Sequence, residues 1–183
     1  VRVVDAAALA ASLGADARFS ETRITAAAAT GPTLAQWLRA EHAPRTRRRV
    51  ARAIGAQMGR IAAARLVNRD HKPENLIIDA ACEQHGEQPI LIDPARVKRL
   101  VRKRNVLRMM FMLWKRSLPV GPMSQRELLT AAAEVFRACP GLAPRARRLD
   151  ELLAYFTRRI AGQQMYFKRY GIEPAAPAAD GPS

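Results

Sequence analysis

Apolar side chains recur at three- and four-residue intervals along most of the chain, which is the spacing of one face of an α-helix. The longest such stretch runs from Arg45 to Leu66, with Val50, Ile54, Met58 and Ile61 on the common face. Gly55 and Gly59 on this helix are two small residues one turn apart. That spacing favours close packing of another backbone in the same chain over dimerisation.

Shorter helices are predicted on both sides of this one. Thr33 has the position of an N-cap, and Ser124 with Glu127 has the spacing of a capping box. A helix from Arg99 onward carries Val106, Met110 and Leu113, and one from near Pro144 carries Leu149, Leu152, Leu153, Phe156 and Ile160. At the amino end, the pattern predicts a short helix over residues 1–14 and a strand beginning at Arg23.

Two short β-type runs interrupt the helical pattern near the middle. The two runs are Leu76–Ile78 and Ile90–Ile92, and the polar segment Glu83–Glu87 lies between them. This arrangement predicts a hairpin with a polar loop. The expected fold class is therefore α+β and mostly α.

The chain is strongly basic, with 31 Lys and Arg against 16 Asp and Glu in 183 residues and a net charge of +15. An apolar fraction of 49% indicates a folded domain with a core. The charge attracts phosphates of nucleic acid, nucleotide, anionic lipid or lipopolysaccharide without choosing among them. A GC-rich genome would produce the same composition. Zinc-finger spacing and interleaved aromatic residues are both absent from the sequence, so nucleic-acid binding is a secondary hypothesis.

Two cysteines are too few for a disulfide framework and fit a reducing compartment. The sequence shows neither a signal peptide nor a membrane span, and it starts with Val, as a fragment or a late start would. We expect a cytoplasmic protein, with peripheral contact at the inner face of the membrane as a further possibility.

The most informative segment is Asn68–Asp79, which reads NRDHKPENLIID and leads from the long helix into the first β-type run. The second run ends in Asp93-Pro94. A hairpin would bring Asn75 and Asp93 together at its open end although 18 residues separate them. We therefore expect Asp70, Asn75 and Asp93 to belong to one site.

The order of helix, loop, hairpin and carboxylate resembles the carboxyl-terminal lobe of protein-kinase-like phosphotransferases, whose signatures are H-R-D-x-x-x-x-N and D-F-G. Arg69-Asp70 is kept, and Asn75 follows Asp70 by five residues. Among bacterial branches the chain is most similar to lipopolysaccharide kinases, which phosphorylate Kdo or heptose sugars. That finer resemblance depends on the helical pattern after Asp93 and on Asp93-Pro94-Ala95-Arg96, which is similar to their I-D-x-x-R form.

The resemblance implies an ATP- and Mg²⁺-dependent kinase that phosphorylates a hydroxyl of an anionic, sugar-containing or other acceptor. Asp70 would orient the acceptor hydroxyl and take its proton, and Lys72 would neutralise γ-phosphate oxygens. Asn75 and Asp93 supply the hard oxygen ligands that suit Mg²⁺.

The chain departs from the family at several points. Asn68 replaces the usual His, and Pro94-Ala95 replaces Phe-Gly. The 71 residues before Lys72 contain no lysine and no G-x-G-x-x-G. We therefore expect residues 1–32 to be a remnant of the amino-terminal lobe and hinge, 33–172 the kinase-like lobe and 173–183 a disordered tail. Missing parts would come from an upstream reading frame, from a partner, or not at all.

Two other functions remain open: a catalytically inactive pseudokinase or regulatory lobe, and a basic nucleic-acid-binding protein. Three polar residues near the motif are expected to be structural. Asp79 is interpreted as a turn residue, His71 as a filler of the loop beside Asp70, and His42 as a solvated loop residue.

Overall fold

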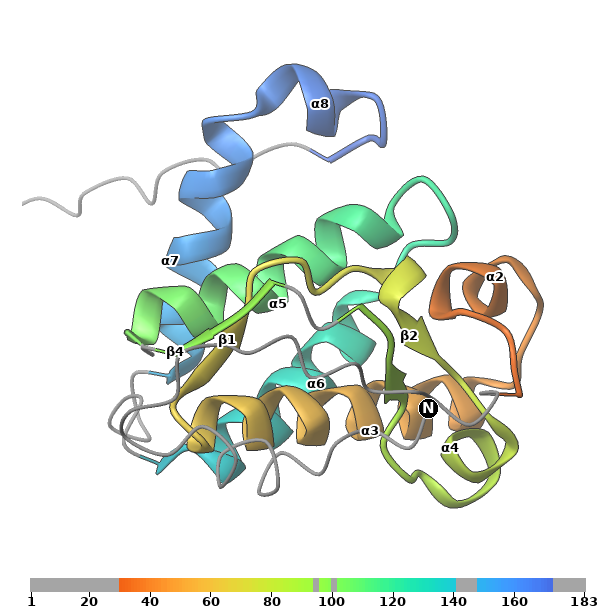
Figure 1. The fold of residues 1–183 in the computed structure, drawn as a ribbon. Helices are drawn as coiled ribbons and strands as arrows, with labels where there is room; N and C mark the ends of the chain where they lie inside the picture. The colour runs from red at the N-terminus through yellow and green to blue at the C-terminus, as the bar shows by residue number, and fades with distance from the viewer. Residues whose placement is uncertain (1–29, 94–95, 100–101, 141–147, 173–183) are drawn as a thin grey trace, which may run out of the picture. The chain divides into compact units, whose positions relative to one another are not determined.

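The computed structural model describes residues 30–93, 96–99, 102–140 and 148–172 (Figure 1). The chain divides into two compact units, residues 1–143 and 144–183. It is α+β and mostly helical, with two small antiparallel sheets, as the sequence pattern predicts. The elements expected before residue 30, the helix start near Pro144 and the tail after 172 lie outside the described residues.

Helices α2 (Leu34–Arg39) and α3 (Pro44–Ala63) begin the described fold. Thr33 is the N-cap of α2, because its hydroxyl oxygen accepts the amide proton of Gln36 and the Gln36 side chain accepts that of Thr33. α3 ends three residues before the predicted Leu66. Arg65 has φ of 58°, which is outside the right-handed helical region, and the chain then enters a strand.

Helix α3 packs against α6 (Gln125–Ala138) through its two glycines. A Cβ added at Gly55 would lie 2.2 Å from the carbonyl oxygen of Ala131, and one at Gly59 would lie 2.6 Å from the Cβ of Ala138. The prediction that this pair allows close approach of another backbone is confirmed. α6 itself begins with the predicted capping box of Ser124 and Glu127.

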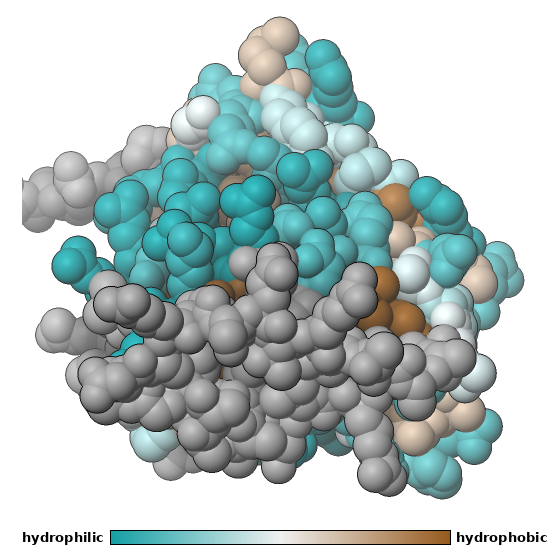
Figure 2. All heavy atoms as spheres, viewed as in Figure 1, coloured by the Kyte–Doolittle hydropathy of each residue, from teal (hydrophilic) through white to brown (hydrophobic). Residues whose placement is uncertain are grey.

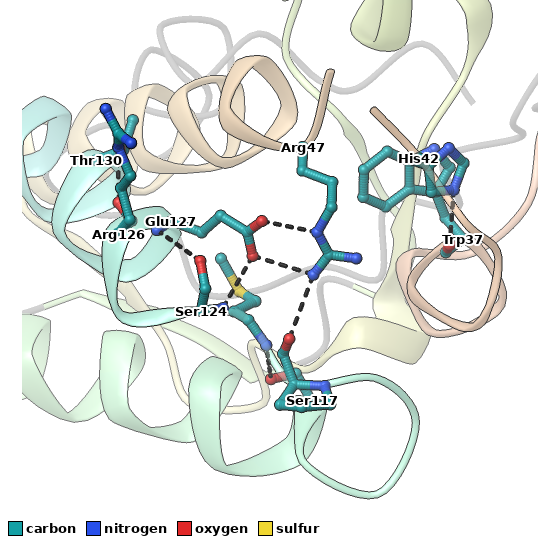
Figure 3. A network of polar contacts seen from close by, with 10 residues as sticks. Trp37, His42, Arg47, Ser117, Ser124, Arg126, Glu127 and Thr130 are labelled. Atoms are coloured by element: carbon teal, nitrogen blue, oxygen red, sulfur yellow. Dashed lines mark hydrogen bonds and ion pairs between the residues drawn. The ribbon is translucent and has the colours of Figure 1, made fainter. Parts of the chain in front are cut away.

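Glu127 also ties α6 to α3 through Arg47 (Figure 3). The Arg47 Nε donates to Oε1 of Glu127 at 2.7 Å and Nη2 donates to Oε2 at 3.0 Å, a two-bond pair. Nη2 also donates to the carbonyl oxygen of Pro122. Burial alone would raise the pKa of Glu127, but hydrogen bonds from Arg47 and Ser124 outweigh it, so that the pKa lies below the ordinary value of 4.5.

Arg47→Gln is expected to lower the free energy of unfolding by about 2 kcal/mol at pH 7, because it leaves a buried carboxylate without its partner. Since the folded pKa of Glu127 is depressed, the stabilisation is present above pH 4.5 and is lost as the pH falls below it. Urea unfolding at pH 7 measures the loss of stability, and urea unfolding at pH 3.5 measures how much of that loss remains. Arg45→Gln, at an exposed arginine, is the control. An equal loss for the two variants at pH 7 would contradict the account.

The strands form two pairs instead of one. β2 (Leu76–Ile77) pairs with β3 (Ile90–Leu91), which is the predicted hairpin in shortened form. β1 (Leu66–Asn68) pairs with β4 (Val97–Arg99), where the sequence pattern predicted the end of a helix and no strand. Thr33 adds an isolated bridge to Ile77.

The segment inside the hairpin is a helix and not a polar loop. Asp79, expected as a turn residue, is the N-cap of α4 (Ala80–His85) and accepts the amide proton of Cys82 at 2.8 Å. Gly86 ends α4 with φ of 74°, in the left-handed region. His42 is also not solvated: its ring stacks on Trp37 at 3.8 Å, and Nδ1 lies 3.4 Å from Glu83 of α4.

Helix α5 (Lys103–Ser117) starts four residues later than predicted and buries Val106, Met109, Met110 and Leu113. The second unit contains α7 (Arg148–Ala161) and α8 (Gln164–Lys168). In the described ranges, every helix is too short or too polar to cross a bilayer.

Candidate functional site

A short loop joins the end of β1 to β2, and hydrogen bonds hold it at both ends. At the first end, the amide of Asp70 donates to Oδ1 of Asn68, a side chain with no exposed surface. At the second end, a 3-10 turn, η1 (Pro73–Asn75), forms as the Asn75 amide donates to the Lys72 carbonyl oxygen. The buried Asn68 side chain therefore fixes the backbone at the start of the loop.

The loop brings three of the four predicted site residues into direct contact. The Nζ of Lys72 lies 2.9 Å from Oδ2 of Asp70. The side-chain amide of Asn75 donates to the same oxygen at 3.3 Å and to the backbone carbonyl oxygen of Asp70 at 3.0 Å. Both donors are thus directed at one side of the Asp70 carboxylate.

These contacts lower the pKa of Asp70 below its ordinary value of 3.8. The hydrogen bond from Lys72 is the largest cause, and the Asn75 hydrogen bond and the charges of Lys72 and Arg96 act in the same direction against burial. Asp70 is consequently a carboxylate at neutral pH. About a third of its side chain remains accessible, with a relative exposure of 31%.

Arg96 is a site residue whose role cannot be seen from its position in the sequence. Its carbonyl oxygen accepts the amide proton of Arg69, which extends the β1–β4 ladder by one step beyond Asn68. The ladder thereby places the Arg96 guanidinium within electrostatic reach of Asp70. Only the pairing of β1 with β4 could have revealed this contact, and neither strand was predicted.

Asp93 lies next to the residue that pairs with Asn75. After Leu76 pairs with Leu91, the amide of Ile92 donates to the Asn75 carbonyl oxygen at 2.9 Å. Asn75 and Asp93 therefore sit at the same end of the β2–β3 pair, as the hairpin argument predicts for the backbone. Asp93 is exposed and has φ of 61°, a left-handed conformation that is uncommon outside glycine and often found at functional positions.

The donor chemistry at this end fits Mg²⁺. Because Asn75 uses its amide nitrogen on Asp70, its Oδ1 faces away from that carboxylate. Asn75 Oδ1 and the Asp93 carboxylate are hard oxygen donors, and Mg²⁺ typically takes one or two protein ligands together with phosphate and water. Among the residues described, His, Cys, Asp and Glu side chains do not gather in groups of three that could enclose a metal.

His71, the next residue after Asp70 and the one expected to fill the loop, is fully buried. Its Nδ1 accepts a hydrogen bond from Asn68 at 3.5 Å, while its buried Nε2 has no partner among the described residues. Burial lowers the pKa of His71 from 6.5 to about 4. The imidazole is therefore neutral in the folded chain at pH 7.

The His71 environment predicts acid sensitivity of the loop. The unfolded chain binds a proton at His71 below about pH 6.5 and the folded chain does not until about pH 4, so stability falls as the pH drops through that range. The loss reaches about 3 kcal/mol at pH 4. His71→Leu should remove this part of the pH dependence, as measured by urea unfolding at pH 7, 5.5 and 4. If wild type and His71→Leu lose the same free energy of unfolding between pH 7 and pH 4, the low pKa of His71 is not the cause of the acid sensitivity.

Comparison of the chain with family models, with curated proteins and with solved structures gives no match. The functional interpretation therefore depends on the residues and geometry of the site.

Proposed function

We propose that the chain is a protein-kinase-like phosphotransferase of the lipopolysaccharide-kinase type. It transfers the γ-phosphate of ATP to a hydroxyl group of an anionic, sugar-containing acceptor. The observation that carries the proposal is the contact of Asp70 with Lys72 and Asn75, at the strand end from which Asp93 also emerges.

Asp70 orients the acceptor. Lys72 and Asn75 occupy Oδ2, so Oδ1 is the oxygen that receives the acceptor hydroxyl and then its proton. A depressed pKa makes Asp70 a weak base. Phosphoryl transfer tolerates a weak base, because its loose transition state requires alignment and charge neutralisation more than proton abstraction.

Lys72 contributes positive charge where the transferred phosphoryl group arrives. Its Nζ is 2.9 Å from Asp70, so a phosphate near the acceptor hydroxyl is within reach of the same ammonium. Asn75 and Asp93 would hold Mg²⁺, which supplies neutralisation of phosphate charge when it is bound.

A second candidate function is a pseudokinase or regulatory lobe. The sequence before Lys72 favours it, because no lysine and no glycine-rich phosphate loop occur there. Nucleotide binding separates the two functions, since an enzyme must bind ATP with its metal and the regulatory lobe need not.

The test is titration of the full chain with ADP and ATP, with and without Mg²⁺, followed by ADP release in the presence of sugar acceptors. The proposal predicts Mg²⁺-dependent nucleotide binding that Asp93→Asn weakens by about tenfold or more. Glu74→Gln is the matched control, because Glu74 is an exposed carboxylate of η1 in the same loop. Absence of binding under every condition would contradict catalysis and support the regulatory lobe.

A further inference from the structure

One stretch of the first unit that is rich in cations covers β4 and α5. Ten Lys and Arg occur from Pro94 to Arg126, and Asp and Glu are absent from that stretch of sequence. Eight of the ten are exposed, and six of these eight, on or next to β4 and the first half of α5, define what we call the β4–α5 basic surface: Arg96, Lys98, Arg99, Arg102, Arg104 and Arg108. Figure 2 shows hydrophilic residues gathered over α5.

Among the described residues, the Asp70 carboxylate lies within electrostatic reach of one member of this surface, Arg96. Within the described ranges, the ion pairs involve none of its six side chains, while Glu127 and Glu134 are taken by arginines of α3 and α6. The start of α5 adds to the charge, because Arg102 at the N-cap makes no capping bond and the first turn has no acidic residue. Cations at the amino end of a helix are repelled by the positive end of the helix dipole, which destabilises the helix. Anions bound there would offset this repulsion.

The basic surface is continuous with the candidate site. Arg108 and Arg69 line one small hollow between α5 and β1, and Arg69 is the neighbour of Asp70. Arg104 lies one turn before Arg108 on the same face of α5. A multivalent anion seated on this surface would therefore lie beside the Asp70 loop.

The second unit has features that distinguish a bilayer from nucleic acid. Among the described residues, the four exposed large apolar side chains are all in this unit: Met165 is 80% exposed, Leu149 48%, Leu153 46% and Tyr170 37%, so that three of the four are aliphatic. Leu149 and Leu153 lie one turn apart on α7, and basic residues follow at Arg158, Arg159, Lys168 and Arg169. Aliphatic side chains beside cations partition into a lipid headgroup region, whereas single-stranded nucleic acid is bound by aromatic stacking.

We propose that the β4–α5 basic surface binds the phosphate groups of a bilayer rich in acidic phospholipid. The second unit, taken by itself, has apolar side chains that can enter the same kind of bilayer. The proposal is independent of phosphotransfer, because membrane attachment requires neither nucleotide nor Asp70. For a kinase, it would present Asp70 to hydroxyl groups carried at a lipid surface.

The test is sedimentation of the full chain with vesicles of phosphatidylcholine containing 30 mol% phosphatidylglycerol, without nucleotide. Each cation near such a surface contributes about fivefold, so the triple variant Arg102→Gln, Arg104→Gln, Arg108→Gln should bind roughly 100-fold more weakly. The control Arg39→Gln, Arg45→Gln, Arg126→Gln removes the same charge from α2, α3 and α6 and should bind within about fivefold of the wild type. The conservative Arg→Lys triple at 102, 104 and 108 should keep binding, which separates loss of charge from loss of fold.

A second variant tests the apolar part. Leu149→Ser, Leu153→Ser, Met165→Ser should weaken vesicle binding about tenfold and leave its salt dependence unchanged. The proposal is overturned if both arginine triples weaken binding equally, since net charge alone would then explain it. It is also overturned if vesicles of pure phosphatidylcholine bind the chain as tightly as the acidic vesicles do. A third contradicting result is a 25-base-pair DNA that binds the chain more tightly than the vesicles do, with binding that depends on the same three arginines.

Discussion

Asp70→Asn is expected to lower the rate of phosphotransfer by about 10³-fold. The amide keeps the shape of the carboxylate but loses its charge, and with it the ability to accept the proton of the acceptor hydroxyl. It also loses the ion pair that positions Lys72 at 2.9 Å. Steady-state ADP release with a saturating sugar acceptor measures the effect.

The fold should survive this substitution. The side chains of Asp70 and Lys72 are each about one-third exposed. An ion pair of this kind contributes only about 1 kcal/mol to stability. Glu74→Gln makes the same chemical change four residues later on an exposed side chain and should leave the rate unchanged. Equal rates for wild type and Asp70→Asn, with both chains folded, would remove Asp70 from the proposed role.

Gly55→Ala is expected to cost about 3 kcal/mol or more in the free energy of unfolding. The new Cβ would lie 2.2 Å from the carbonyl oxygen of Ala131 and 2.7 Å from its Cα. Because those atoms belong to the backbone of α6, relief requires that α3 and α6 move apart along their contact. Chemical denaturation monitored by circular dichroism measures the loss.

Alanine substitutions at two other glycines provide a comparison for the cost at Gly55. Gly59→Ala should cost less than Gly55→Ala, because the nearest atom is the side-chain Cβ of Ala138 at 2.6 Å and the backbone lies at 3.3 Å. Gly162→Ala meets nothing closer than 3.5 Å and should change stability by less than about 1 kcal/mol. A Gly55→Ala chain as stable as Gly162→Ala would show that the helices are not in contact at this point.

The helices were predictable because their signals are local. Thr33 and Ser124 each lie three residues before a Gln or Glu that completes a capping box, and both boxes form. The small-residue pair of Gly55 and Gly59 likewise indicated close packing before its partner, α6, was known. Such signals depend on side chains within one turn of each other, so they need no knowledge of tertiary structure.

The strands β1 and β4 were missed because their stability comes from pairing. Each has three residues, and Leu66 continues the apolar spacing of α3, so the pattern alone extends the helix. The helix α4 was a different error. Asp79 and Gly86 are ordinary start and stop residues for a helix, and they were interpreted as parts of a loop.

The site was predictable to the extent that the loop is short. Asp70, Lys72 and Asn75 lie within six residues, and the β2–β3 pair brings Asp93 to the same end. Arg96 needed the β1–β4 ladder, and the burial of His71 needed the surrounding core, so neither followed from spacing. The assignment of Mg²⁺ to Asn75 and Asp93 remains a prediction.

The most direct measurement of the central proposal is paramagnetic line broadening by Mn²⁺ in the presence of ADP, with Mn²⁺ in place of Mg²⁺. The account predicts that amide signals of residues 70, 75, 92 and 93 broaden together at one equivalent of metal, and that Asp93→Asn abolishes the effect while Glu74→Gln does not. Broadening confined to other residues, or none at these four while ADP is bound, would contradict a single cation shared by Asn75 and Asp93 beside Asp70.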